Sequence, residues 1–133
     1  MSFVNKMFNR INLKGYEAFK SSVEKLTGKN EVNVYFTGSK NDTGVSWCPD
    51  CVSAEPHVLD AVEKFAKKES IFMYVDVGDR TFWKDMKNPF RTDKDVLIQV
   101  IPTLIRWKAH QRLEGPQCEN KDLLEMFFTE ADD

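Results

Sequence analysis

Two cysteines separated by two residues constrain this chain more than any other feature of its sequence. Cys48 and Cys51 enclose Pro49 and Asp50, and they stand between a predicted strand with its loop and a predicted helix. A Cys-x-x-Cys pair in that position is typical of a redox-active dithiol. The third cysteine, Cys118, has no close partner in the sequence. Three cysteines are too few for the disulfide framework of a small secreted protein, so we expect a reducing compartment.

The residue types of this motif suit the first turn of a helix. With Cys48 as the N-cap, Pro49 falls at the first helical position, where its missing N–H costs nothing. The Cys48 sulfur can then accept a backbone N–H of the first turn, and the positive end of the helix dipole favours its thiolate. Both effects lower the pKa of Cys48 and make it the expected exposed nucleophile. Cys51 lies one turn further along and is the expected shielded, resolving thiol.

Two other interpretations of the cysteine pair remain open. One is half of a structural zinc site, which would need four ligands. The remaining Cys and His residues form no second pair at ligand spacing; they are His57, His110 and Cys118. The other interpretation is a pair of inert buried thiols. We favour redox chemistry and expect no metal and no cofactor, and we expect Cys118 to be a spare thiol, with a regulatory thiol as the alternative.

Hydrophobic periodicity predicts an α/β fold. Apolar residues at steps of two, or in short runs, predict strands, and steps of three and four predict helices. The predicted strands are 11–13, 32–36, 71–75, 103–107 and 110–114; the predicted helices are 16–26, 48–68, short turns within 79–95, and one that follows Asn120. This order predicts a mixed central sheet of four to five strands with helices on both faces. The length of 133 residues predicts a single domain, 1–133, in which 1–9 form an N-terminal extension. The basic and apolar residues of that extension leave a mitochondrial transit peptide as a weaker alternative.

Charge and hydropathy exclude several classes of protein. The chain has 19 Lys and Arg residues against 21 Asp and Glu residues, a net charge of −2, so we expect no nucleic-acid partner. Its longest apolar run is 71–75, far shorter than a membrane span, and no secretory signal is apparent. We therefore expect no membrane association and a cytoplasmic location.

The motif itself carries a family resemblance. Trp47-Cys48-Pro49-Asp50-Cys51 resembles the active site of the thioredoxin superfamily, and Ile101-Pro102-Thr103 resembles the cis-proline turn that faces it. Within that superfamily, roughly residues 10–130 are similar to the thioredoxin domain-containing protein 17 family of thioredoxin-related cytosolic proteins. The similarity is carried by 35–40 (YFTGSK), 46–51 (SWCPDC), 54–56 (AEP), 83–85 (WKD) and 90–91 (FR).

The resemblance implies a thioredoxin fold and a protein-disulfide reductase that uses a reversible Cys48/Cys51 dithiol. It also implies electrons from NADPH through thioredoxin reductase, and small disulfides such as cystine or selected protein disulfides as substrates. The resemblance further implies a peroxidase activity and a redox signalling role. We also expect the protein to be a monomer. The alternative is a non-catalytic, redox-sensitive interaction module that uses the fold to hold a partner.

The resemblance also assigns site residues. Cys48 carries over as the nucleophile, Cys51 as the resolving cysteine and Pro102 as the cis-proline. We expect three residues to contact substrate, namely Trp47, Ile101 and Thr103, and four to tune the site, namely Trp47, Pro49, Asp50 and Pro102.

Two departures from ordinary thioredoxin affect these assignments. A buried Asp of the second strand lies behind the cysteines in thioredoxin, whereas the matching position here is Tyr35. Asp50 is the nearest carboxylate in the sequence and is expected to tune the site, with a plain helix-dipole acid as the alternative. The long loop of residues 38–46 is expected to crowd the substrate groove and to narrow the choice of protein partners.

Overall fold

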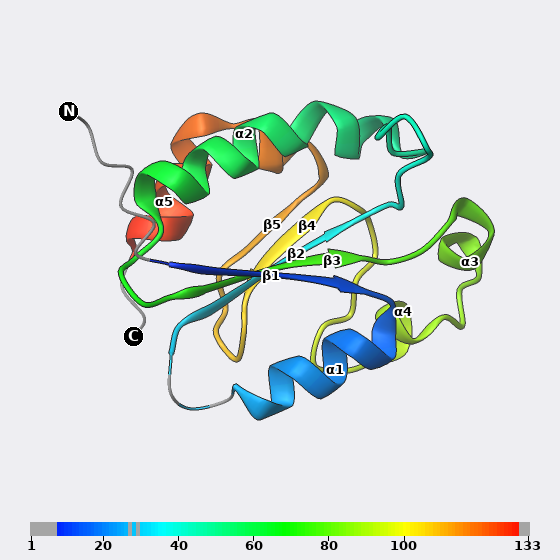
Figure 1. The fold of residues 1–133 in the computed structure, drawn as a ribbon, viewed down its shortest axis with the longest axis horizontal. Coiled ribbons are helices and arrows are strands. Elements are labelled where there is room, and N and C mark those ends of the chain that lie inside the picture. Colours follow the sequence, from blue (N-terminus) through cyan, green and yellow to red (C-terminus); the bar gives the residue numbers. More distant parts are fainter. Residues whose placement is uncertain (1–7, 27, 29, 131–133) are drawn as a thin grey trace.

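The computed structural model describes residues 8–26, 28 and 30–130, and it has the α/β architecture expected from the sequence (Figure 1). The elements are β1 (Asn9–Lys14), α1 (Tyr16–Lys25), β2 (Val32–Thr37), α2 (Pro49–Phe65), β3 (Ile71–Asp76), α3 (Arg80–Lys84), α4 (Pro89–Thr92), β4 (Thr103–Arg106), β5 (Arg112–Glu114), the 3-10 helix η1 (Gly115–Glu119) and α5 (Lys121–Thr129). Residues 1–7 of the expected extension lie outside the described residues, and Asn9 is the first residue of β1.

The five strands form one mixed sheet. Their order is β1-β3-β2-β4-β5, with β3 parallel to both β1 and β2, and with β4 antiparallel to both β2 and β5. β2 is the central strand, and all six of its residues are buried. A fully buried central strand needs cover on both faces of the sheet. The helices that follow β1, β2 and β5 in the chain provide this cover. The expected mixed sheet and thioredoxin fold are confirmed.

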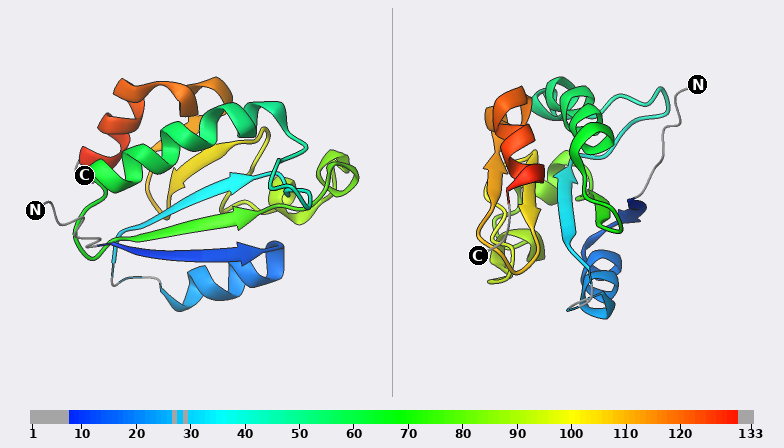
Figure 2. Two further views of the ribbon diagram at one scale, coloured as in Figure 1. Left: turned by 45° about the horizontal axis from the view of Figure 1, so that its top comes forward. Right: turned by 90° about the vertical axis from the view of Figure 1, so that its left-hand side faces the viewer.

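The helices cover both faces of the sheet, as expected. α2 and α5 lie on one face, and α1 with the short α4 lies on the other (Figures 1 and 2). Neighbouring residues of β2 point to opposite faces, because side chains alternate along a strand. Phe36 therefore packs with Phe19 and Phe90 on the α1 face, whereas Tyr35 packs with Val58 on the α2 face. The C-terminal end of β2 leads directly into the loop that precedes the cysteine motif.

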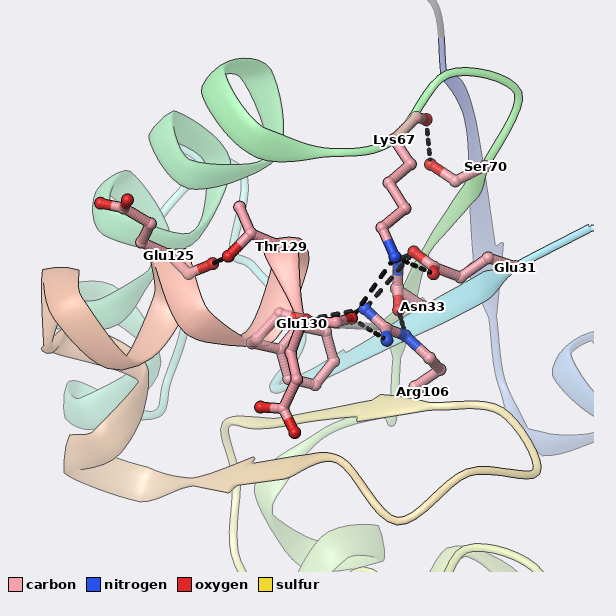
Figure 3. A network of polar contacts seen from close by, with 9 residues as sticks. Glu31, Asn33, Lys67, Ser70, Arg106, Glu125, Thr129 and Glu130 are labelled. Atoms are coloured by element: carbon pink, nitrogen blue, oxygen red, sulfur yellow. Dashed lines mark hydrogen bonds and ion pairs between the residues drawn. The ribbon is translucent and has the colours of Figure 1, made fainter. Parts of the chain in front are cut away.

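A buried arginine ties the last helix to the sheet (Figure 3). Arg106 of β4 is 2% exposed, and its guanidinium donates to the Phe127 carbonyl at 2.7 Å and the Glu130 carbonyl at 3.0 Å. It also donates to the Asn33 side chain at 3.1 Å and lies 3.4 Å from a carboxylate oxygen of Glu31. The terminal carbonyls of a helix lack intrahelical partners, so this arginine satisfies groups that would otherwise need water.

Local signals located most element boundaries correctly. The side chain of Asn120 accepts the Leu123 N–H and begins α5 at the expected place. The expected turns within 79–95 are α3 and α4, whose N-caps are Asp79 and Asn88. The 3-10 helix η1 was not expected. It begins at Gly115, which has a φ of 57°, so a turn replaces the loop between β5 and α5.

None of the helices within the described part of the chain is both long enough and apolar enough to span a membrane.

Candidate functional site

Cys48 caps helix α2 in the geometry that the sequence predicts. Its backbone is extended, Pro49 is the first helical residue, and its sulfur accepts the Cys51 N–H at 3.2 Å. The hydroxyl of Ser46 accepts the Cys48 N–H at 3.1 Å and donates to the Gly38 carbonyl at 3.0 Å. The sulfur of Cys48 is therefore held at the positive end of a 17-residue helix. A hydrogen bond and a helix dipole of this kind stabilise a thiolate over a thiol.

The two cysteines form a disulfide, with their Cα atoms 5.2 Å apart. Cys48 is 5% exposed and Cys51 is 1% exposed, so Cys48 is the more accessible of the two. The expectation of a plainly exposed Cys48 is wrong for this state of the protein. The Cys48 sulfur is bonded to Cys51 and lies 3.7 Å from the Ile101 carbonyl oxygen, and both neighbours contribute to its burial.

The cis-proline turn faces the cysteines. The Ile101–Pro102 bond is cis, as expected, and the Ile101 carbonyl oxygen lies 3.7 Å from the Cys48 sulfur. Ile101 is 7% exposed. Thr103 is fully buried, and its hydroxyl donates to the Val100 carbonyl at 2.7 Å. The structure therefore places Ile101 beside the Cys48 sulfur. The Thr103 side chain lies inside the protein instead, where its hydrogen bond stabilises the turn.

Trp47 and the loop before it form one side of the site. The indole N–H of Trp47 donates to the Gly78 carbonyl at 2.9 Å, and the ring is half-buried. Gly38 lies so close beneath it that a Cβ atom at that position would meet the ring at 2.9 Å. The loop of residues 38–46 is folded back on itself, because a β-bridge joins Lys40 to Ser46. These contacts place Trp47 next to Cys48 without burying it.

Asp50 and Pro49 lie at the surface in the first turn of α2. Tyr35 is fully buried and belongs to the hydrophobic cluster that packs against α2. Burial raises the pKa of its phenol well above the ordinary value, so Tyr35 is neutral at physiological pH.

A polar cluster one turn below Cys51 was missed from the sequence. Glu55 accepts a short hydrogen bond from the Tyr74 hydroxyl, and its other carboxylate oxygen pairs with the Lys40 ammonium at 2.6 Å. The three side chains come from α2, β3 and the loop before the motif. The sequence held one signal, the spacing of four residues between Cys51 and Glu55, which places both on one helix face.

Cys118 is fully buried and lies beside the cis-proline turn. Its sulfur is 3.9 Å from the Pro102 carbonyl oxygen and 3.6 Å from that of Leu113. Burial raises the pKa of this free thiol to about 12, so it is protonated at neutral pH. Among the residues that the structure describes, no group of three or more His, Cys, Asp or Glu side chains is arranged to hold a metal ion.

Comparison with known proteins places the chain among thioredoxin-like proteins. Residues 12–130 match the family model described as "Thioredoxin domain-containing protein 17-like, thioredoxin domain". The chain is 39% identical to human thioredoxin domain-containing protein 17 over 123 residues. These aligned residues make up 92% of this chain and 97% of the human protein. The Danio rerio protein of that name is 41% identical over the same length and the same shares of both chains. The thioredoxin-like protein Clot of Arabidopsis thaliana is 33% identical over 114 residues, 79% of this chain and 84% of the relative.

Proposed function

The chain belongs to the thioredoxin domain-containing protein 17-like family, as its sequence motifs indicated, and from this premise we propose that it is a protein-disulfide reductase. The observation that carries the proposal is the sulfur of Cys48 at the N-terminus of α2, with the Ile101 carbonyl beside it and Cys51 within disulfide distance. This arrangement supplies an activated nucleophile, a backbone edge for substrate and a second thiol.

The reaction follows from these three parts. In the reduced protein, the Cys51 N–H and the helix dipole stabilise the Cys48 thiolate. That thiolate attacks one sulfur of the substrate disulfide, a mixed disulfide with Cys48 forms, and the other substrate sulfur leaves as a thiolate. Cys51 then attacks the Cys48 sulfur and releases the second substrate sulfur. The substrate gains two electrons, and the protein returns to the Cys48–Cys51 disulfide.

The cis-proline turn and Trp47 supply the substrate groove. An extended substrate segment can align its backbone along Ile101, in the manner of strand addition to a free edge. Trp47 offers an aromatic surface on the other side of Cys48. Pro49 and Asp50 set the charge and shape of the first turn, and Pro102 fixes the direction of the Ile101 carbonyl.

The family supports a set of partners for this chemistry. The electrons come from NADPH through thioredoxin reductase, and the substrates are small disulfides such as cystine and selected protein disulfides. A peroxidase activity and a redox signalling role can use the same dithiol. The protein works without a bound cofactor, as a single-domain monomer in the cytoplasm, where the low cysteine content of the chain is in keeping with a reducing compartment.

A coupled assay tests the proposal. NADPH consumption with thioredoxin reductase is followed with cystine or insulin as substrate, for the wild-type protein and for Cys48→Ser, Cys51→Ser and Cys118→Ala. We expect turnover by the wild type and by Cys118→Ala, and none by the other two variants. Substrate-dependent turnover that survives in Cys48→Ser would exclude the mechanism, and its absence from the wild type would favour the non-catalytic interaction module.

A further inference from the structure

The resolving step poses a chemical problem that the cysteine pair alone does not solve. Cys51 must lose its proton before it can attack, because the thiolate is the nucleophile. It is 1% exposed, and burial of a thiol disfavours the charged form. Cys118 illustrates the size of this effect, since burial raises the pKa of its thiol to about 12. The Gly38 N–H donates to the Cys51 sulfur at a long 3.5 Å, which gives a Cys51 thiolate little stabilisation, so Cys51 needs a proton acceptor nearby.

One cavity joins Cys51 to a carboxylate. Its volume is about 230 Å³, and Cys51 and Glu55 both line it from the same face of α2. Lys40 is the other ionisable residue of its lining, and the remaining residues are Gly44, Val45, Ser46, Val52, Pro56 and Leu59. A cavity of this size accepts water, and Lys40 and Glu55 supply polar partners for it. The cavity therefore leaves room for water beside both Cys51 and Glu55.

Two side chains bind the Glu55 carboxylate directly, and two more ionisable groups lie around them. Tyr74 of β3 donates to one carboxylate oxygen, and Lys40 pairs with the other at 2.6 Å. Arg10 of β1 lies over the Tyr74 ring, 4.9 Å from its centroid, and Tyr35 of β2 lies within electrostatic range of Glu55. The Glu55 side chain keeps 19% exposure, which gives the proton a route to solvent.

The other acids and phenols nearby are less suited to this role. Asp50 lies at the surface in the first turn of α2 and does not line the cavity. Asp76 accepts the Gly78 N–H at 2.8 Å and lines a separate pocket with Thr37. Tyr35 is a neutral phenol with a raised pKa, so it has no site for a further proton.

We propose that Glu55 is the proton acceptor for Cys51 in the resolving step, with Lys40 and Tyr74 as its positioning residues. This inference rests on the proposed reductase function and deepens it. The Cys51 S–H proton passes to the Glu55 carboxylate, the Cys51 thiolate attacks the Cys48 sulfur, and the Cys48–substrate bond breaks as the Cys48–Cys51 bond forms. The substrate sulfur leaves with the electron pair of the broken bond, and Glu55 returns the proton to it or to solvent.

Two-step kinetics with 5,5′-dithiobis(2-nitrobenzoate) separate this role from the function of Cys48. In a Cys118→Ala background, Cys48 of the reduced protein releases one coloured thionitrobenzoate in a step that depends on reagent concentration. Cys51 then releases the second thionitrobenzoate in an intramolecular step, whose rate does not depend on reagent concentration. We expect Glu55→Gln to leave the first step unchanged and to slow the second about ten- to a hundredfold near neutral pH. At alkaline pH the difference should vanish, because solvent base then deprotonates Cys51.

Matched variants keep the result interpretable. Asp60→Asn removes another α2 carboxylate, which pairs with Lys64 at the surface, and should change neither step. Glu55→Asp retains a carboxylate and should recover part of the second step. An unchanged second step in Glu55→Gln, or one slowed equally at every pH, would overturn the role of Glu55. A wild-type protein that releases no thionitrobenzoate would overturn the reductase function itself.

Discussion

The sulfur of Cys48 lies 3.7 Å from the carbonyl oxygen of Ile101, 53 residues away in the chain. The contact brings the N-terminus of α2 against the turn that enters β4. In the proposed mechanism, the nucleophilic sulfur therefore lies next to a backbone edge rather than a side-chain pocket, and a backbone edge can bind extended segments of many sequences. Selectivity must then come from the surroundings of that edge, and the loop of residues 38–46 is the largest of these.

Shortening that loop should favour large substrates. The Asn41 side chain accepts the N–H groups of Thr43 and Val45, so residues 41–44 form a local turn, and Gly44 lines the same cavity as Cys51. Replacing 41–44 with a Gly-Gly pair keeps Lys40 and removes this bulk. We expect the ratio of insulin reduction to cystine reduction to rise, as measured by coupled NADPH consumption. An unchanged ratio in a variant with normal thermal stability would exclude the loop as a determinant of specificity.

Removing the charge of Asp50 should favour the thiolate of Cys48. The Cys48 thiolate at the N-cap of α2 and the Asp50 carboxylate in its first turn are both negative, so they repel. Exposure of Asp50 to water weakens this repulsion to about 1 kcal/mol or less. Asp50→Asn should therefore increase the thiolate fraction of Cys48 by less than about tenfold. Thiolate absorbance followed against pH measures it. A smaller thiolate fraction in the variant would mean that Asp50 does not act on Cys48 through its charge.

The parts of the site that could be predicted from the sequence depend on short stretches of chain. The Cys48 cap needs only Pro49 and one helical turn, and the cis bond at Pro102 follows from a local motif that resembles a known one. The Glu55 cluster could not be predicted, because its partners Tyr74 and Lys40 come from other elements. A lone acid on a helix usually indicates a solvated face.

The fold also has parts that local sequence patterns predict and parts that depend on contacts between distant segments. Periodicity predicted the five strands and their helices, since each follows from a local pattern. The hydrogen bonds of Arg106 to the end of α5 could not be predicted, because an arginine on a short strand does not indicate which helix end packs against it. η1 was also missed, since its first turn depends on a positive φ at Gly115.

Loss of the buried arginine should destabilise the protein. Arg106→Met removes the donor to the Phe127 carbonyl, and it leaves Lys67 as the remaining cation beside Glu31 and the Glu130 carbonyl. Loss of this buried charged donor takes away the hydrogen bonds to the Phe127 carbonyl and to the Asn33 side-chain oxygen, so the free energy of unfolding should fall by about 3 kcal/mol. Urea denaturation measures this, with the exposed Arg80→Met as control. A loss no larger than that of the control would show that the network contributes little to stability.

The cluster around Asp93 should make stability depend on pH. Burial raises the pKa of Asp93, but hydrogen bonds from Lys20 at 2.7 Å and Tyr16 at 2.5 Å outweigh it, and the pKa lies below the ordinary value. A lowered pKa contributes stability above the unfolded-state value, near pH ~4, and this contribution is lost as pH falls through the folded-state value. The wild type should therefore lose more stability than Asp93→Asn on acidification from neutral pH. Equal losses in urea denaturation would contradict this.

The roles of the two cysteines are tested most directly by trapping the mixed disulfide. Reduced Cys51→Ser is mixed with cystine, and the adduct is located by mass spectrometry of peptides. We expect one half-cystine on Cys48, stable until an excess of small thiol releases it, because no resolving thiol remains. Cys48→Ser should form no such adduct at a comparable rate. An adduct that forms faster on Cys51 of Cys48→Ser than on Cys48 of Cys51→Ser would contradict the assignment of nucleophile and resolving thiol.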